Sequence, residues 1–264
     1  MKIEQLCVDN LREGVFCGQG QQHGPEVYDQ LEAWLQGDLL RGQVAKDDEG
    51  RVAGFTLYYP IEEAPLDVTG EGLYMVQCLF VKPEYQDRGI GRALLESAMA
   101  DARNQGAAGL AVEAYHGVKR AGFDYMPSTF FQHLGMKPGE SRGSATLFLS
   151  MLDSNGRPPK YLQRSFEPPG DGPRLRIDIL DCRRCYVRAT NTAVVKAVAE
   201  AVESIDAEVV VHDQNSREAI LDKGMSSGVF IDGKLTFFQG PISEQDVWNA
   251  IQIADTARKH ASDR

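Results

Sequence analysis

The segment that decides the fold is LYMVQCLFVKPEYQDRGIGRALL, residues 73–95. It begins with a nearly continuous apolar run at Leu73–Val81, which is typical of a central strand buried on both faces. A proline ends this run, a turn with Gly89 and Gly91 follows, and an Ala- and Leu-rich helix then extends to about Asn104. The sequence therefore predicts a strand, a glycine turn and a helix in direct succession.

The glycine turn has the features of a phosphate-binding site. Glycines let the backbone approach a ligand with no Cβ in the way. The first amides of a helix have no internal partner and lie at the positive end of the helix dipole, so they attract a phosphate. Arg88 and Arg92 add positive charge. Two glycines alone are equally compatible with a tight packing turn that binds nothing, and that alternative stays open on this pattern alone.

Apolar periodicity and turn residues predict the elements around this segment. They are a helix at Pro25–Leu40, strands at Gln43–Lys46 and Val52–Tyr59, a strand at Gly109–Ala114, a short helix at Pro127–Leu134 and closing strands within Lys137–Met151.

The pattern Gln-x-x-Gly-x-Gly, between an apolar strand and an Ala- and Leu-rich helix, resembles the acetyl-CoA motif of the GCN5-related N-acetyltransferase (GNAT) family. The resemblance covers about residues 1–150. It implies an α/β fold with a mixed sheet, splayed between its fourth and fifth strands, and acetyl-CoA as cosubstrate with its pantetheine arm in the splay. The backbone of Phe80 and Val81 would pair with that arm. The residues implied around the pyrophosphate are Gln86, Asp87, Arg88, Gly89, Ile90, Gly91 and Arg92.

The reaction that this resemblance implies is attack of an amine on the thioester, which needs a base for the amine proton and an acid for the departing thiolate. Glu113, on the predicted strand, is one candidate base, and His116 is the other, because the unperturbed pKa of an imidazole suits a base at neutral pH. Many family members supply the acid from a tyrosine at the position of Phe131, which has no hydroxyl. Tyr125 is the candidate acid in its place. Each of the three candidates also has a purely structural reading.

A Pro- and Gly-rich stretch divides the chain. Leu152–Pro173 contains five of the 12 prolines and three glycines, a density that disfavours both helix and strand. The predicted organisation is a GNAT-like domain at residues 1–151, a linker at 152–173 and a second domain at 174–264.

The second domain is predicted to have the order β-α-β-α-β-β-α, with Cys182-Arg183-Arg184-Cys185 at the start of its first helix. This order with Cys-x-x-Cys at that place resembles a thioredoxin-like domain. The whole arrangement resembles proteins with a C-terminal YoaP-like domain. The predicted elements are strands at Arg174–Leu180 and Glu208–His212, helices at Val187–Ser204, Ser216–Lys223 and Glu244–Ala257, and a hairpin of Val229–Ile231 with Leu235–Phe238.

A thiolate at a helix start is stabilised by free amides, and two arginines add charge, so we expect Cys182 to be exposed and to attack, and Cys185 to resolve. Unreactive core thiols are an alternative. Structural zinc with His212 is another, although one Cys-x-x-Cys supplies only two of four ligands, so no metal site is predicted. Gly228 stands where thioredoxin-like folds usually place a cis-proline. The space that it opens favours capture of a soft metal ion or metalloid by the two thiolates.

Composition limits the partners. The formal charge is −10, which argues against nucleic acid or an anionic membrane as a partner. No run of about 18 apolar residues and no secretory signal is visible, and five cysteines make no disulfide scaffold. A cytoplasmic protein is therefore predicted. Residues 1–150 carry a net charge of −8, which serves solubility or attracts a cationic amine.

Two functions follow as hypotheses. The first is an acetyl-CoA-dependent N-acetyltransferase for a small amine, with an appended thiol domain for redox or metalloid binding. The second is a thiol-based redox or metalloid-binding protein whose first domain binds acyl-CoA without efficient transfer. A homodimer is an assembly often found among acetyltransferases of this kind.

Overall fold

The chain forms two compact units. The computed structural model describes residues 1–16, 23–120, 123–153, 155–170, 172–201, 205–238 and 241–262. One unit comprises Met1–Ala64 and Val68–Tyr161, and the other comprises Pro65–Asp67 and Leu162–Arg264. Cys17 and the predicted helix end at Ser204 lie outside the described residues.

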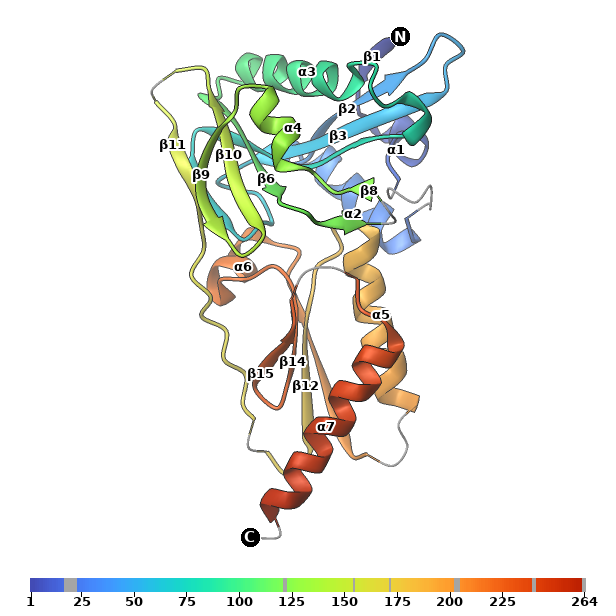
Figure 1. Ribbon diagram of the computed structural model, residues 1–264, viewed down its shortest axis with the longest axis vertical. Helices are drawn as coiled ribbons and strands as arrows, with labels where there is room; N and C mark the ends of the chain where they lie inside the picture. Colours follow the sequence, from blue (N-terminus) through green and yellow to red (C-terminus); the bar gives the residue numbers. More distant parts are fainter. Residues whose placement is uncertain are drawn as a thin grey trace. The chain divides into compact units, whose positions relative to one another are not determined.

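The first unit is built on a seven-stranded sheet of order β1-β2-β3-β5-β6-β10-β9 (Figure 1). Only β5 and β6 pair in parallel, and the other neighbours are antiparallel, so the sheet is mixed as predicted. Its strands are β1 (Lys2–Gln5), β2 (Arg41–Lys46), β3 (Val52–Pro60), β5 (Leu73–Val81), β6 (Gly109–Tyr115), β9 (Lys137–Arg142) and β10 (Ala145–Met151).

Helices cover both faces of this sheet (Figure 1). Trp34 packs edge-on against Tyr59 at 5.7 Å between ring centroids, whereas the neighbouring Tyr58 donates a 2.7 Å hydrogen bond to Asp101. Successive side chains of a strand point to opposite faces, so the helices that carry Trp34 and Asp101 lie on opposite sides. The helices are α1 (Val8–Gly14) and α2 (Pro25–Gln36) on one face, and α3 (Ile90–Asn104) and α4 (Ser128–His133) on the other.

The two parallel strands separate partway along their length. Their pairing runs from Leu73 opposite Gly109 to Val76 opposite Val112. β5 then continues to Val81 alongside β3 only, while β6 continues alongside β10. The register against β3 shifts at the same place, so the residue after Val76 is an extra residue on β5. The sheet is therefore splayed at the point that the sequence comparison with the family implied.

The predicted linker contains a strand that the sequence did not reveal. β11 (Arg157–Tyr161) pairs with β4 (Val68–Glu71) in a two-stranded sheet. Pro158 and Pro159 fall at the irregularity of its register, between the pairs that Arg157 and Lys160 make. Prolines are tolerated at such edges because the missing amide has no ladder partner to lose. The expectation that the whole of Leu152–Pro173 is free of strand is wrong for this reason.

The second unit holds a four-stranded sheet of order β13-β12-β14-β15. β12 is parallel to β13 and antiparallel to β14, and β14 forms a hairpin with β15. The elements are β12 (Leu175–Asp181), α5 (Tyr186–Ala201), β13 (Ala207–Asp213), α6 (Arg217–Lys223), β14 (Gly228–Ile231), β15 (Lys234–Phe237) and α7 (Glu244–Ser262). This is the predicted order of elements.

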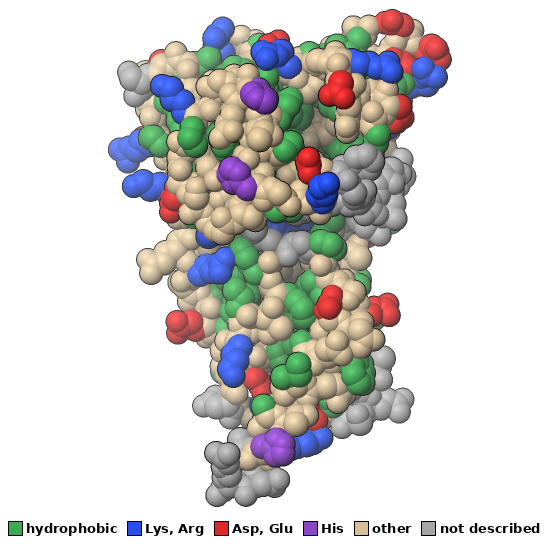
Figure 2. Space-filling view, in the orientation of Figure 1, with side chains coloured by type: hydrophobic (Ala, Val, Ile, Leu, Met, Phe, Trp, Pro, Cys, Tyr) green, Lys and Arg blue, Asp and Glu red, His purple; other side chains and the backbone are tan. Residues whose placement is uncertain are grey.

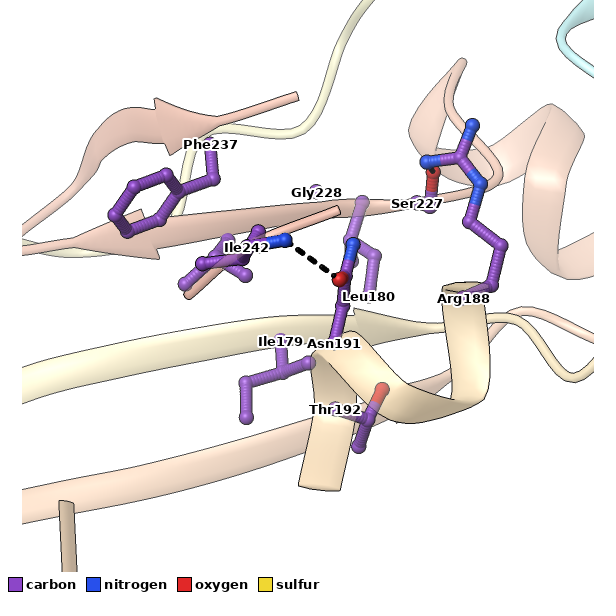
Figure 3. Close-up of a pocket in the computed structure, with 10 residues that line it drawn as sticks. Ile179, Leu180, Arg188, Asn191, Thr192, Ser227, Gly228, Phe237 and Ile242 are labelled. Carbon is purple, nitrogen blue, oxygen red and sulfur yellow. Dashed lines mark hydrogen bonds between the residues drawn. The ribbon is translucent and has the colours of Figure 1, made fainter. Parts of the chain in front are cut away.

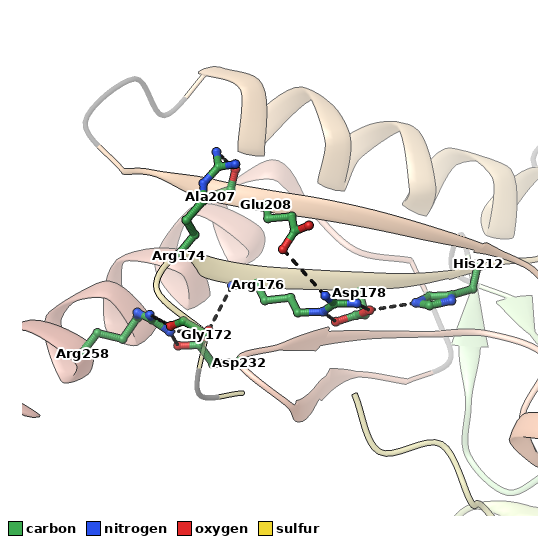
Figure 4. Close-up of polar contacts among 9 residues, drawn as sticks. All are labelled: Gly172, Arg174, Arg176, Asp178, Ala207, Glu208, His212, Asp232 and Arg258. Carbon is green, nitrogen blue, oxygen red and sulfur yellow. Dashed lines mark hydrogen bonds and ion pairs between the residues drawn. The ribbon is translucent and has the colours of Figure 1, made fainter. Parts of the chain in front are cut away.

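Alternate residues of β12 face different surroundings. Ile177 and Ile179 pack with Val195 of α5 and Val247 of α7. The opposite face carries Asp178, a carboxylate with no exposed surface. Figure 4 shows its partners. Arg176 Nε donates to the Asp178 carboxylate at 2.8 Å, and His212 Nε2 lies 2.8 Å from it. A buried charge is tolerated when it is paired in this way.

Two short strands of the first unit form a separate two-stranded sheet. β7 (Lys119–Arg120) and β8 (Phe123–Asp124) form a short hairpin before α4.

Within the described ranges, no helix combines the length and the apolar character that crossing a bilayer requires.

Candidate functional site

The turn between β5 and α3 presents backbone amides. A short 3-10 helix at Pro83–Tyr85 leads into it, and Asp87 and Gly89 both have positive φ, at 58° and 76°. The first hydrogen bond of α3 runs from the amide of Ala93 to the carbonyl of Gly89. The amides just before Ala93 are therefore the ones that a helix leaves without an internal acceptor. They lie at the positive end of a 15-residue helix.

The two glycines of the turn have different structural roles. A Cβ on Gly89 would meet nothing within 4 Å, so its glycine serves the left-handed backbone conformation. A Cβ on Gly91 would lie 3.1 Å from the ring of Phe130 and 3.7 Å from Val81. Gly91 therefore lets α3 pack closely against α4 and β5. The close-packing reading of the sequence thus applies to Gly91, while Gly89 is exposed.

Side chains around the turn supply charge and hold its shape. The guanidinium of Arg88 lies 5.6 Å from the ring centre of Tyr85, and the Tyr85 hydroxyl donates to Asp47 at 2.7 Å. That hydrogen bond holds the pKa of the Asp47 carboxyl well below its usual range. Gln86 Nε2 donates to the carbonyl of Val81 at 3.1 Å. Arg92 is exposed and lies 3.8 Å from Glu96, so it can turn toward an anion.

The backbone of β5 faces the splay at alternate residues. The amide of Leu79 donates to the sulfur of Met126 at 3.2 Å, on the side away from β3. The carbonyl of Phe80 lies against Gly54 of β3, so the backbone of Phe80 faces the neighbouring strand. Because backbone groups alternate in direction along a strand, Val81 faces the splay together with Leu79. Of the two residues expected to pair with a pantetheine arm, Phe80 therefore has its backbone turned toward β3, whereas Val81 faces the splay.

Glu113 is the first residue of β6 beyond the last pair with β5. Its carboxylate accepts a 2.6 Å hydrogen bond from the hydroxyl of Tyr115, whose ring lies 5.3 Å from the ring of Tyr125. Burial, and after it the negative charge of Glu113, raise the pKa of the Tyr161 hydroxyl well above its ordinary value, so Tyr161 belongs to the surroundings of Glu113. The structure thus brings Glu113 and Tyr125 together through Tyr115. Tyr161 was missed because it falls in the predicted linker.

His116 belongs to a different set of contacts. Its Nδ1 lies 2.8 Å from the hydroxyl of Ser128, and its Nε2 lies 3.3 Å from the hydroxyl of Thr146. The Thr146 hydroxyl also lies 2.9 Å from that of Ser141. Both ring nitrogens are therefore engaged by hydroxyl groups, and one of these hydrogen bonds has to break before His116 can accept a proton from a substrate.

Phe131 lies in the core. Its side chain has no exposed surface, and its ring meets that of Phe130 edge-on at 5.1 Å. The Phe131 side chain has no proton to donate, and it is packed among the apolar side chains of the core.

The cysteine pair is arranged differently from the expectation. Cys182 is only 1% exposed, and burial raises the pKa of its thiol despite the nearby Arg184 and Arg188. Cys185 is partly exposed and lies at the start of α5, where its carbonyl accepts from the amide of Arg188 at 3.1 Å. The expectation of an exposed, activated Cys182 is wrong, because the thiol precedes the helix and is packed away from water.

Polar contacts surround the cysteine pair within the second unit. Arg184 donates to the carbonyl of Pro65 at 2.9 Å, and Arg188 to the hydroxyl of Ser227. Figure 3 shows Arg188 reaching toward Ser227 at the rim of a small pocket, with Gly228 beside it. A Cβ on Gly228 would lie 3.2 Å from both Met225 and Leu235, so this position is tightly packed. The open space that the sequence predicted at Gly228 is therefore limited by Met225 and Leu235.

No group of three or more His, Cys, Asp and Glu side chains suited to a metal ion occurs among the residues that the structure describes. His212, the alternative zinc ligand, instead contacts Asp178 and the ring of Phe166 at 4.9 Å. On the described part of the face drawn in Figure 2, acidic and basic side chains are interspersed.

Residues 8–121 match the model of the acetyltransferase (GNAT) family. The chain therefore contains a GNAT domain. The matched family is one of acetyltransferases. The splay between β5 and β6 and the turn before α3 both lie within the matched residues.

Individual proteins resemble the chain over part of its length. An uncharacterized N-acetyltransferase, YoaP, of Bacillus subtilis is 23% identical over 133 residues, which are 50% of this chain and 51% of that protein. The chain thus spans about half the length of this curated relative. A GNAT acetyltransferase structure from Staphylococcus aureus is 12% identical, with a TM-score of 0.43 over 58% of this chain and 100% of that one. The PaiA N-acetyltransferase of Thermoplasma acidophilum, in complex with coenzyme A, is 17% identical, with a TM-score of 0.40 over 57% and 99%.

Proposed function

We propose that the chain acetylates a small amine with acetyl-CoA as acetyl donor. The observation that carries this proposal is the turn of Gln86–Arg92, exposed at Gln86–Gly89 and with left-handed Gly89 ahead of α3, at the open end of the splay. The amides of Asp87, Arg88, Gly89, Ile90 and Gly91 would hold the pyrophosphate, with charge from Arg88 and Arg92. The match of residues 8–121 to the GNAT family supports this assignment.

The pantetheine arm would run along β5 toward the narrow end of the splay, where Glu113 lies. Glu113 is the preferred base because its carboxylate is held by Tyr115 and it follows directly after the last paired residues of β5 and β6. It would take the proton of the amine while the amine nitrogen attacks the thioester carbonyl. The carbon–sulfur bond then breaks, and Tyr125 would give its proton to the departing thiolate. His116 is the second candidate base.

The test is a Glu113→Gln variant in an assay that measures free CoA released across a panel of small amines. We expect kcat for the best acceptor to fall about 100-fold, since general-base catalysis typically contributes 10²–10⁴-fold, with acetyl-CoA affinity unchanged. Glu140→Gln is the matched control, because Glu140 also contacts Tyr161 but lies on the edge strand β9. If Glu113→Gln retained full turnover, Glu113 would not be the base.

The alternative, an acyl-CoA binder without efficient transfer, is favoured by Phe131 at the position of the usual acid. The same assay separates the two functions. An acetyltransferase releases free CoA with at least one amine of the panel, whereas a binding domain holds acetyl-CoA and releases none.

We propose a thiol function for the second unit, which we assign to a thioredoxin-like domain. Partly exposed Cys185 beside buried Cys182 supports it. In exchange with a disulfide substrate, the Cys185 thiolate would attack one sulfur and release the other as a thiolate. Cys182 would then attack Cys185, release the second substrate thiolate and leave a Cys182–Cys185 disulfide. Joint capture of a soft metalloid such as arsenite by both thiols is the alternative use of the same pair.

A further inference from the structure

We infer that Met126 lines the acyl pocket of the GNAT domain and sets which acyl groups the enzyme accepts. This inference rests on the proposed acetyl-CoA function. Met126 is 4% exposed, and its sulfur accepts the hydrogen bond of the Leu79 amide at 3.2 Å inside the splay. Of the two β5 residues whose amides face the splay, Leu79 lies nearer to the narrow end, where the acyl group of a CoA thioester would lie.

The bond between the Leu79 amide and Met126 is one that a thioester carbonyl can replace. A thioether sulfur is a weak acceptor, whereas a carbonyl oxygen is a strong one. A partly buried amide held by a weak acceptor is thus available to an incoming carbonyl, which it would polarise for attack. Free CoA has no acyl carbonyl and leaves the sulfur contact in place.

The backbone at Met126 is held in place by its neighbours. Its φ is +44°, a left-handed conformation that non-glycine residues adopt only rarely. The carbonyl of Met126 accepts the amide of Tyr115 at 2.9 Å, and the preceding residue is the proposed acid Tyr125. Met126 is therefore attached directly to the two tyrosines beside Glu113. Since methionine is flexible, its side chain can move while this backbone stays fixed.

The experiment measures dissociation constants of CoA, acetyl-CoA and butanoyl-CoA for the full chain by calorimetry. Met126→Leu keeps the volume and removes the sulfur acceptor. We expect acetyl-CoA to bind about three- to tenfold more tightly than to the wild type, since it no longer displaces a hydrogen bond, with CoA unchanged. Met126→Ala also removes bulk, and we expect it to shift the preference toward butanoyl-CoA about tenfold.

Met136→Ala is the matched control, because Met136 is equally buried in the same core cluster. It should lower stability as Met126→Ala does, with no change in acyl preference. The inference is overturned if Met126→Leu changes CoA and acetyl-CoA affinities equally or not at all, or if Met136→Ala shifts the preference as much as Met126→Ala. Failure of the wild type to bind acetyl-CoA would instead overturn the proposed function.

Discussion

The two units place similar turns in different surroundings. In the GNAT domain, Gln86–Gly89 is exposed between a strand and a long helix, and its working groups are backbone amides. In the second unit, the cysteine loop also joins a strand to a long helix, but Cys182 is 1% exposed and only Cys185 reaches the surface. A backbone site is determined by local conformation, whereas the reactivity of a side chain depends on what packs around it.

The largest expected effect is a loss of acetyl-CoA affinity when the turn around Gly89 is altered. Gly89→Asp should weaken acetyl-CoA binding by at least about 100-fold, because a carboxylate would face the pyrophosphate and displace charge-assisted hydrogen bonds. Calorimetry measures it. Gly106→Asp is the matched control, since Gly106 also has positive φ (78°) and open space around its Cβ, at the other end of α3. Equal loss of affinity in both variants would show a general effect of strain at either end of the helix.

The next largest expected effect is a difference in alkylation rate between the two cysteines of the pair. Iodoacetamide should alkylate Cys185 at least about tenfold faster than Cys182, since a buried thiol with a raised pKa forms little thiolate. Mass spectrometry of tryptic peptides follows both sites in the folded chain. In Cys185→Ser the fast phase should disappear, and in Cys182→Ser it should remain. Faster labelling of Cys182 would restore the role that the sequence predicted.

In the first unit, burial disfavours the charged form of a histidine. The expected effect, on the free energy of unfolding, is smaller. His23 is buried, which lowers the pKa of its imidazole from 6.5 to about 4. Between these pH values the unfolded chain binds a proton that the folded chain does not. The stabilisation of the folded state is thus complete above about pH 6.5 and is lost as pH falls to about 4, by on the order of 3 kcal/mol.

Urea unfolding between pH 4 and 7 checks this prediction. His23→Gln should flatten the dependence of the free energy of unfolding on pH in this window. His133→Gln is the control, because His133 is exposed at the end of α4. An unchanged slope in His23→Gln, or an equal change in both variants, would show that His23 does not cause it.

The sequence predicted the elements that depend on local patterns. The strand Leu73–Val81 and the helix end at Asn104 were predicted with the bounds that the structure has, because an apolar run and glycine punctuation are local signals. The strand at Arg157–Tyr161 was missed, since its prolines oppose strand formation locally and only pairing with β4 stabilises it. Prediction from local pattern therefore fails where a distant partner decides the structure.

The candidate sites divide in the same way. The turn around Gly89 was predicted, whereas the contact of Leu79 with Met126 joins residues 47 positions apart and has no sequence signal. Glu113 and Tyr115 alternate along one strand, a period that places them on one face. The burial of Cys182 could not be predicted, because the pattern Cys-x-x-Cys gives the spacing of the thiols and not their exposure.

Hydrogen–deuterium exchange of the full chain, with and without acetyl-CoA, tests the central claim most directly. The claim is that the amides of Asp87–Gly91 bind the pyrophosphate. Peptides that cover these residues should exchange more slowly when acetyl-CoA is bound, while peptides that cover Cys182–Cys185 should exchange at an unchanged rate. Saturating acetyl-CoA with no protection at Asp87–Gly91, or with protection only in the second unit, would contradict the account.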